Sequence, residues 1–164
     1  MAKKKNPDFR ISMNLFLYGQ GNLGKTTTLR MLYNKLSGKI MSSNSTREIF
    51  TYKRMNIVIC TTGDTRRFIE GNIAFLKKHI KKGQENIIFI SAVNQKMDSY
   101  DAMHNYQEEI MEGYVDSKFI LWVEKLDPKI EEQPYVEGGS KKTSNIDSTR
   151  LKEIIDFYIK NKLI

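Results

Sequence analysis

The sequence predicts an α/β fold built on a mostly parallel sheet with one antiparallel strand. Two observations support this prediction. Short apolar runs, each the length of a buried strand, alternate along the chain with segments whose apolar residues recur at helical spacing. Two of the strand-like runs, 48–53 and 55–60, are almost continuous. That separation favours an antiparallel hairpin, because parallel strands need a connection of about 12 or more residues.

The chain of 164 residues has the length of one compact domain. We expect residues 13–164 to form that domain, preceded by a basic N-terminal extension at 1–12. The basic start has no apolar stretch behind it, so it does not read as a signal peptide. No apolar run approaches the roughly 18 residues that span a bilayer. We therefore expect a cytoplasmic protein without a membrane partner.

The first predicted strand is the apolar run 13–18, which ends at Gly19. A helix follows the glycine-rich segment and ends at Gly38. The apolar residues on one face of this helix are Leu29, Leu32, Tyr33 and Leu36. The Ser, Asn and Thr residues at 41–46 predict a loop before the hairpin, because such side chains bond their own backbone.

The second half of the chain continues the alternation. A helix is predicted from Thr65 to near Gly83, a strand at 86–90, a helix from Asp98 or Ser99 to Gly113, and a strand at 119–123. A long polar loop is predicted from Asp127 to Asn145, because it holds two prolines and Gly138-Gly139. Asp147 is predicted as the N-cap of the last helix, with Ile146 and Leu151 placed as a hydrophobic staple.

The charge of the chain and its cysteine and histidine content limit which partners and metal sites we expect. The net charge of +8 would attract polyanions, but the lysine clusters are scattered and aromatic residues do not interleave with them. Cys60 lies within an apolar run and is predicted to be a small buried hydrophobic side chain. A zinc site is not expected, because the one cysteine and the two histidines, His79 and His104, are too few and too isolated.

The stretch GQGNLGKT, residues 19–26, satisfies two phosphate-binding patterns. Read as G-x-G-x-x-G, it would open a dinucleotide fold, which also needs an acidic residue at the end of the next strand to hold the ribose. Glu48 is the nearest acid, and it begins a strand instead of ending one. Read as G-x-x-x-x-G-K-[ST], the stretch places Lys25 and Thr26 in register between a buried strand and a helix, which is the setting of a P-loop. The second reading is favoured.

The residue types fit the chemistry of a P-loop. Glycines tolerate the backbone angles and the close approach that let main-chain N–H groups surround a phosphate. The N-terminus of the following helix adds partial positive charge. Lys25 would bridge the β- and γ-phosphates of a nucleotide, and the Thr26 hydroxyl would bind Mg²⁺. The expected nucleotide-binding residues are Gly19, Gln20, Gly21, Asn22, Leu23, Gly24, Lys25, Thr26 and Thr27.

On these residues the chain resembles the P-loop NTPase superfamily, in which GQGNLGKT would be the Walker A motif. The resemblance implies a three-layer α/β fold and an acidic residue, at the end of a neighbouring strand, that positions Mg²⁺. Asp64 is the candidate, since it closes the run that begins with the predicted strand 55–60. With Thr26 it would complete the metal site. Its alternative role is that of the N-cap of the helix from Thr65 onward.

Small phosphotransferases such as nucleotide kinases offer one comparison within the superfamily. Their arginines near the phosphates stabilise charge during transfer and grip the acceptor. Arg66 and Arg67 directly follow Asp64, and with Lys25 these are the expected catalytic residues. No arginine occurs from residue 68 to 149, where nucleotide kinases usually carry an arginine-bearing lid. The only long candidate for a lid is the loop from Asp127 to Asn145, with Lys141 and Lys142.

GTPase-like switches offer the other comparison. Their hairpin after a polar loop is similar to the predicted one, and Ser45 or Thr46 would stand at the position of their magnesium-sensing threonine. The segment 95–98, Gln-Lys-Met-Asp, approaches the guanine-reading N-K-x-D pattern but has Gln in place of Asn. Asp64 does not open a D-x-x-G motif either. ATP is therefore expected in preference to GTP.

The sequence thus predicts a Mg²⁺-dependent enzyme, an NTPase or a kinase-like phosphotransferase. It would bind a nucleoside triphosphate and transfer the γ-phosphoryl group to a small acceptor or to water. A GTPase-like nucleotide-dependent switch or regulatory module is one alternative. A nucleic-acid-associated ATPase is another, and it rests on the positive charge alone.

Overall fold

The structure, a computed structural model, describes residues 10–21, 24–80, 83–112, 116–126 and 141–164. The elements in chain order are β1 (Arg10–Gly19), α1 (Lys25–Ser37), β2 (Arg47–Tyr52), β3 (Met55–Cys60), α2 (Arg66–His79), β4 (Ile87–Asn94), α3 (Met97–Met111), β5 (Asp116–Ser117), β6 (Ile120–Glu124) and α5 (Lys141–Lys160). The described residues therefore contain six strands and four helices, which confirms the predicted α/β class. β1 begins at Arg10, within the expected N-terminal extension, and residues 1–9 lie outside the described residues.

One mixed sheet runs through the centre of the molecule. Its strand order is β2-β3-β4-β1, and both β5 and β6 pair with β1 on its other side. β2 and β3 form the predicted antiparallel hairpin, and the other pairings are parallel. β4 is buried along its whole length and separates β3 from β1. The strand that leads to Asp64 is therefore not a direct neighbour of β1, which corrects the arrangement expected from the resemblance.

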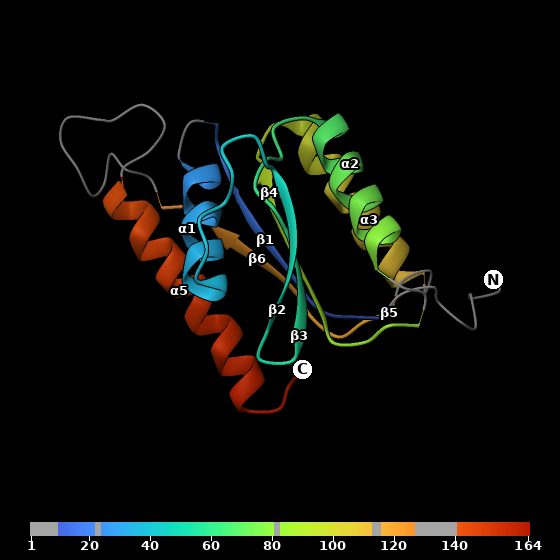
Figure 1. The fold of residues 1–164 in the computed structure, drawn as a ribbon. Coiled ribbons are helices and arrows are strands. Elements are labelled where there is room, and N and C mark those ends of the chain that lie inside the picture. Colours follow the sequence, from blue (N-terminus) through green and yellow to red (C-terminus); the bar gives the residue numbers. More distant parts are fainter. Residues whose placement is uncertain (1–9, 22–23, 81–82, 113–115, 127–140) are drawn as a thin grey trace.

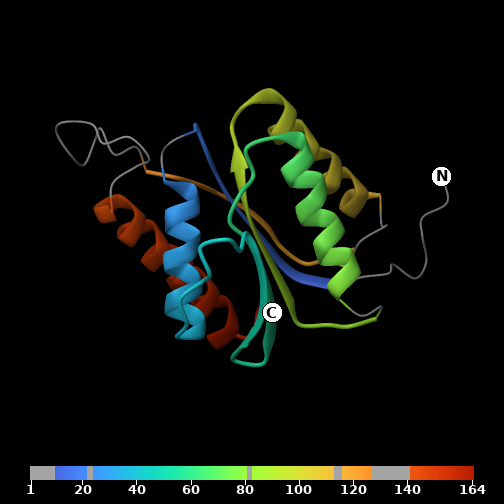
Figure 2. The ribbon, with the colours of Figure 1, turned by 45° about the horizontal axis from the view of Figure 1, so that its top comes forward.

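The helices cover the two faces of the sheet in pairs. α1 packs with α5 on one face and α2 with α3 on the other, as Figure 1 shows, and the turned view in Figure 2 agrees. Successive residues of a strand point to opposite faces, so Leu15 joins the apolar core under α1 and α5, and Phe16 joins the core under α2 and α3. The result is three layers. No helix among the described residues is long and apolar enough to cross a bilayer.

Single residues in the local sequence determine where α1 ends and where α2 begins. α1 ends at Gly38, which has a φ of 74° and donates its N–H to the carbonyl of Asn34. α2 is capped by Thr65, whose hydroxyl accepts a hydrogen bond from the N–H of Phe68. Thr65, and not Asp64, is therefore the N-cap of α2, and the carboxylate of Asp64 is left for other partners.

The last helix begins earlier than predicted. α5 starts at Lys141, so part of the expected loop is helical and Asp147 is not an N-cap. The rest of that loop, 127–140, lies outside the described residues. The buried side chains of the first turns of α5 are polar, and they are Thr143, Ser144, Asp147 and Ser148. The prediction was wrong because apolar periodicity starts only at Leu151.

Asp147 is buried because its carboxylate has several hydrogen-bond donors. The Nζ of Lys125 lies 2.9 Å from Asp147 Oδ2, and neither side chain is exposed. The N–H of Leu126 also donates to Oδ2, at 3.0 Å, and Arg150 donates to Oδ1. A buried ion pair holds its place only when such bonds compensate the loss of water. These contacts fix the end of β6 to the start of α5.

Replacing Lys125 by Met tests this junction. Lys125→Met should lower the free energy of unfolding by about 3 kcal/mol, because it leaves the carboxylate of Asp147 buried without its ammonium partner. Urea denaturation followed by circular dichroism measures the loss. Lys53→Met is the matched control, since it removes an exposed ammonium from Asp156, and it should leave stability nearly unchanged. An equally small loss for both variants would contradict the assigned role of Lys125.

Candidate functional site

The glycine loop joins the end of β1 to the start of α1. Gly24 is the N-cap of α1 and has a φ of 87°, in the left-handed region that glycine adopts without strain. It offers no side-chain cap, and the first turn of α1 contains no acidic residue. The N–H groups at this helix end are therefore suited to an anion. Asn22 and Leu23, which belong to the expected loop, lie outside the described residues.

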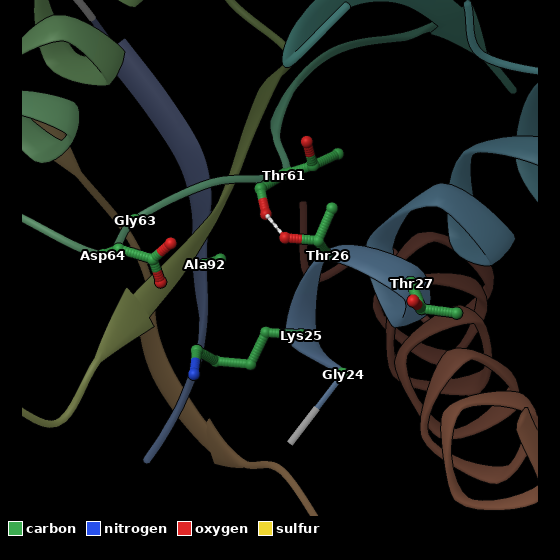
Figure 3. A pocket seen from close by; sticks show the side chains of 8 residues that line it. All are labelled: Gly24, Lys25, Thr26, Thr27, Thr61, Gly63, Asp64 and Ala92. Atoms are coloured by element: carbon green, nitrogen blue, oxygen red, sulfur yellow. Dashed lines mark hydrogen bonds between the residues drawn. The ribbon is translucent and has the colours of Figure 1, made fainter. Parts of the chain in front are cut away.

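A hollow of about 180 Å³ opens at this end of α1, as Figure 3 shows, and is termed the first hollow. Its lining residues are Gly24, Lys25, Thr26, Thr27, Thr61, Gly63, Asp64 and Ala92. The fold thus brings the start of α1 together with the loop between β3 and α2 and with β4. Five of the lining residues are ones that the sequence predicted, and the other three are Thr61, Gly63 and Ala92.

Lys25 is the charged group of the first hollow with the least exposure, at 5%. Its Nζ donates to the carbonyl oxygens of Gly19, at 3.1 Å, and Gln20, at 2.6 Å. Burial lowers the pKa of Lys25 to about 8; the charge of Asp64 opposes this shift and that of Lys125 adds to it. Near neutral pH the ammonium is still protonated, but its bonds go to neutral carbonyls.

The side chains of Thr26 and Thr27, at the start of α1, point in different directions. The Thr26 hydroxyl donates to the carbonyl of Thr61 at 2.9 Å, on the side of the first hollow (Figure 3). This bond uses the hydroxyl proton and leaves oxygen lone pairs for another partner. The Thr27 side chain points away from Lys25 and Asp64 in the same view, so any contact that Thr27 makes with a ligand there would come from its backbone.

A close backbone approach brings Asp64 to the first hollow across β4. The carbonyl of Gly63 accepts the N–H of Asn94, at 2.9 Å. A Cβ on Gly63 would lie only 1.8 Å from the carbonyl oxygen of Ala92, so only glycine fits there. The β3–α2 loop therefore lies directly on the end of β4. Asp64 follows, exposed and lining the same hollow as Lys25.

The donor set fits a hard divalent cation such as Mg²⁺. Thr26 would supply a hydroxyl oxygen and Asp64 a carboxylate oxygen, and Mg²⁺ is commonly bound through one or two protein groups plus phosphate oxygens and water. No three His, Cys, Asp or Glu residues gather at one place within the described part of the chain. These two oxygens therefore suit an ion that arrives together with phosphates better than one held by the protein alone.

The two expected arginines are not brought into the first hollow. Arg66 borders a groove between α2 and α3, with Glu70 and Tyr106, and Arg67 is exposed in the first turn of α2. Arg47, which precedes the hairpin, donates from Nε to Asn72 Oδ1 at 2.8 Å. In the structure these arginines belong to the α2 side of the sheet and not to the glycine loop.

Other residues that the sequence singled out lie next to the first hollow without lining it. Gln20 and Gly21 line a separate hollow beside the glycine loop, and Gln95 and Lys96 of the N-K-x-D-like segment line it too. The carbonyl of Thr46 accepts the N–H of Thr61 at 2.9 Å. Thr61 thus links the polar segment at 41–46 to Thr26 of α1.

Sequence reasoning missed one contact with the glycine loop and one charged group that acts on Lys25. The hydroxyl of Ser144 on α5 lies 3.4 Å from the carbonyl oxygen of Gly24. Lys125 is near enough to Lys25 to lower its pKa. No local pattern in the sequence marks either residue, because both reach the loop from segments about 100 residues away in the chain.

Comparisons of the chain with models of protein families, with curated proteins and with solved structures find no match. The geometry of the hollow and the chemistry of its lining are therefore the basis for a functional proposal.

The lowered pKa of Lys25 predicts a pH dependence of stability. Between pH 8 and 10.5 the folded protein loses the proton of Lys25 while the unfolded chain keeps it, so this group makes stability rise with pH over that range. Lys25→Met should remove that contribution, and the free energy of unfolding, from urea titrations across this range, should rise less steeply than in the wild type.

Lys78→Met is the control for this measurement, because Lys78 is exposed near the end of α2. It should keep the pH dependence of the wild type. A Lys25→Met protein with the same slope as the wild type would show that burial does not lower the pKa of Lys25.

Proposed function

We propose that this chain is a Mg²⁺-dependent P-loop protein that binds a nucleoside triphosphate, ATP in preference to GTP. It transfers the γ-phosphoryl group to a small acceptor or to water. The observation that carries the proposal is the buried ammonium of Lys25, which shares the first hollow with Thr26, Asp64 and the uncapped N-terminus of α1. A buried cation whose hydrogen bonds go to the neutral carbonyls of Gly19 and Gln20 has charge available for an anion.

Each group has a role in phosphate binding. The ammonium of Lys25 would exchange its bonds to the carbonyls of Gly19 and Gln20 for phosphate oxygens, which are stronger partners because they are charged. The N–H groups of the first turn of α1 would orient the same phosphates. Both sets of donors are already fixed by the fold, so they stabilise developing charge with little rearrangement.

Thr26 and Asp64 would hold the metal ion beside the phosphates. When bound, Mg²⁺ neutralises part of the negative charge on the phosphoryl oxygens. Thr61 keeps the Thr26 hydroxyl oriented, and the contact of Gly63 with β4 keeps Asp64 in place. Phosphoryl transfer depends mainly on positioning and electrostatics, so the proposal needs no further nucleophile. It assigns no role to Arg66 or Arg67.

Binding of MgATP tests the proposal. Lys25→Ala should weaken binding about a hundredfold, because charged hydrogen bonds to the phosphates are lost. Isothermal titration calorimetry measures the affinity. Lys35→Ala is the matched control: Lys35 lies on the same helix but contacts Asn145 and Thr149, and its loss should leave affinity unchanged. Wild-type protein that does not bind MgATP, or a Lys25→Ala protein with full affinity, would overturn the proposal.

One observation favours a nucleotide-dependent switch as a second candidate function. The backbone of Thr61 connects Thr26, through its carbonyl, to Thr46, through its N–H. A metal ion drawn to Thr26 could therefore act on the segment 42–46.

Hydrogen exchange distinguishes the switch from the enzyme. A switch predicts that amides at 42–46 are protected more with a nonhydrolysable triphosphate than with the diphosphate. Equal protection with both nucleotides would count against the switch and favour the enzyme.

A further inference from the structure

A second hollow, of about 610 Å³, lies beside the first half of the glycine loop. Its lining residues are Gln20, Gly21, Asn94, Gln95 and Lys96, and none of them lines the first hollow. The volume is within the range of sites for small molecules. Gln20 and Gly21 belong to the expected nucleotide-binding loop, but the roles proposed above use no side chain that lines this space.

Backbone hydrogen bonds fix the walls of the second hollow. The N–H of Gln95 donates to the carbonyl of Gly19 at 2.8 Å, so the β4–α3 loop is attached to the glycine loop. Asn94 is 4% exposed, and its side-chain Oδ1 accepts the N–H of Lys96 at 3.0 Å. Its Nδ2 lies against Gly21, 3.4 Å from the position that a Cβ would take there. These contacts hold the β4–α3 loop and the start of the glycine loop together around the hollow.

Lys25 connects the two hollows. Its Nζ lies 2.6 Å from the carbonyl oxygen of Gln20, a residue that lines the second hollow, while Lys25 itself lines the first. A terminal phosphate gripped by this ammonium would lie at the border between them. An acceptor approaches the transferred phosphorus from the side opposite the leaving group. The second hollow borders the Lys25 ammonium through Gln20, so an acceptor held there would lie close to that phosphate.

The lining indicates what kind of molecule would fit. Gln20, Asn94 and Gln95 carry carboxamides, which both donate and accept hydrogen bonds and so suit hydroxyl groups. Lys96 is exposed at the rim and adds a positive charge that suits an anionic group. Apolar side chains are absent from the five lining residues.

We propose that the second hollow binds the phosphoryl acceptor, a small hydroxyl compound that also carries a phosphate or carboxylate group. This inference rests on the proposed function. The hydroxyl oxygen of the acceptor forms a bond to the γ-phosphorus, and the bond from that phosphorus to the β–γ bridging oxygen breaks. The nucleoside diphosphate leaves, and the hydroxyl proton passes to water.

The experiment first measures MgATP binding to the wild-type protein and then follows transfer of labelled γ-phosphate. The probes are two matched pairs, glycerol with glycerol 3-phosphate and adenosine with adenosine monophosphate, and glycerate is the carboxylate probe. We expect transfer to at least one anionic probe, above hydrolysis, and little to the uncharged member of its pair. Lys96→Ala should raise the KM for that probe about tenfold, with unchanged affinity for MgATP.

Lys78→Ala is the control, since it removes an exposed lysine of α2 and should leave the KM unchanged. Transfer to water alone, or equal KM values for Lys96→Ala and wild type, would overturn the acceptor site while the nucleotide proposal stands. A Lys96→Ala protein with weakened MgATP affinity would place the nucleotide itself in the second hollow and would also overturn the inference. Wild-type protein that does not bind MgATP would overturn both.

Discussion

The hydrogen bonds of a buried lysine ammonium to two neutral backbone carbonyls are the interaction on which the rest of the site depends. The carbonyls of Gly19 and Gln20 hold the Nζ of Lys25, and burial lowers its pKa to about 8. Such an arrangement costs stability, because the loss of water around the ammonium outweighs the attraction of Asp64. Proteins keep costs of this kind at sites where a ligand supplies the missing interaction.

Contacts from two directions hold the glycine loop in its place. The β4–α3 loop bonds to the carbonyl of Gly19, and Ser144 of α5 reaches the carbonyl of Gly24. Across the first hollow from the loop, Gly63 lies directly on the end of β4 and brings Asp64 to the hollow. The ion pair of Lys125 and Asp147 fixes α5 to β6, so the helix that supports the loop is itself anchored by buried charge.

Much of the fold could be predicted because its signals are local. The apolar runs that became β1, β3, β4 and β6 are continuous in the sequence, and the tight connection between β2 and β3 already indicated a hairpin. Strand order could not be predicted, because β4 pairs with both β1 and β3 through contacts between distant segments. The start of α5 was missed for a related reason: its buried face is polar, and partners elsewhere in the chain determine the burial of a residue such as Asp147.

The sequence by itself determined which residue types form the glycine loop and where it lies, since Gly24, Lys25 and Thr26 are consecutive and a strand and a helix flank them within a few residues. Only the tertiary structure decided which distant groups share the hollow. It placed Asp64 there and left Arg66 outside, although the two are only two residues apart. The reason is physical: Thr65 caps α2, so Asp64 stays in the loop that lines the hollow, whereas Arg66 is the first residue of the helix and borders the groove between α2 and α3.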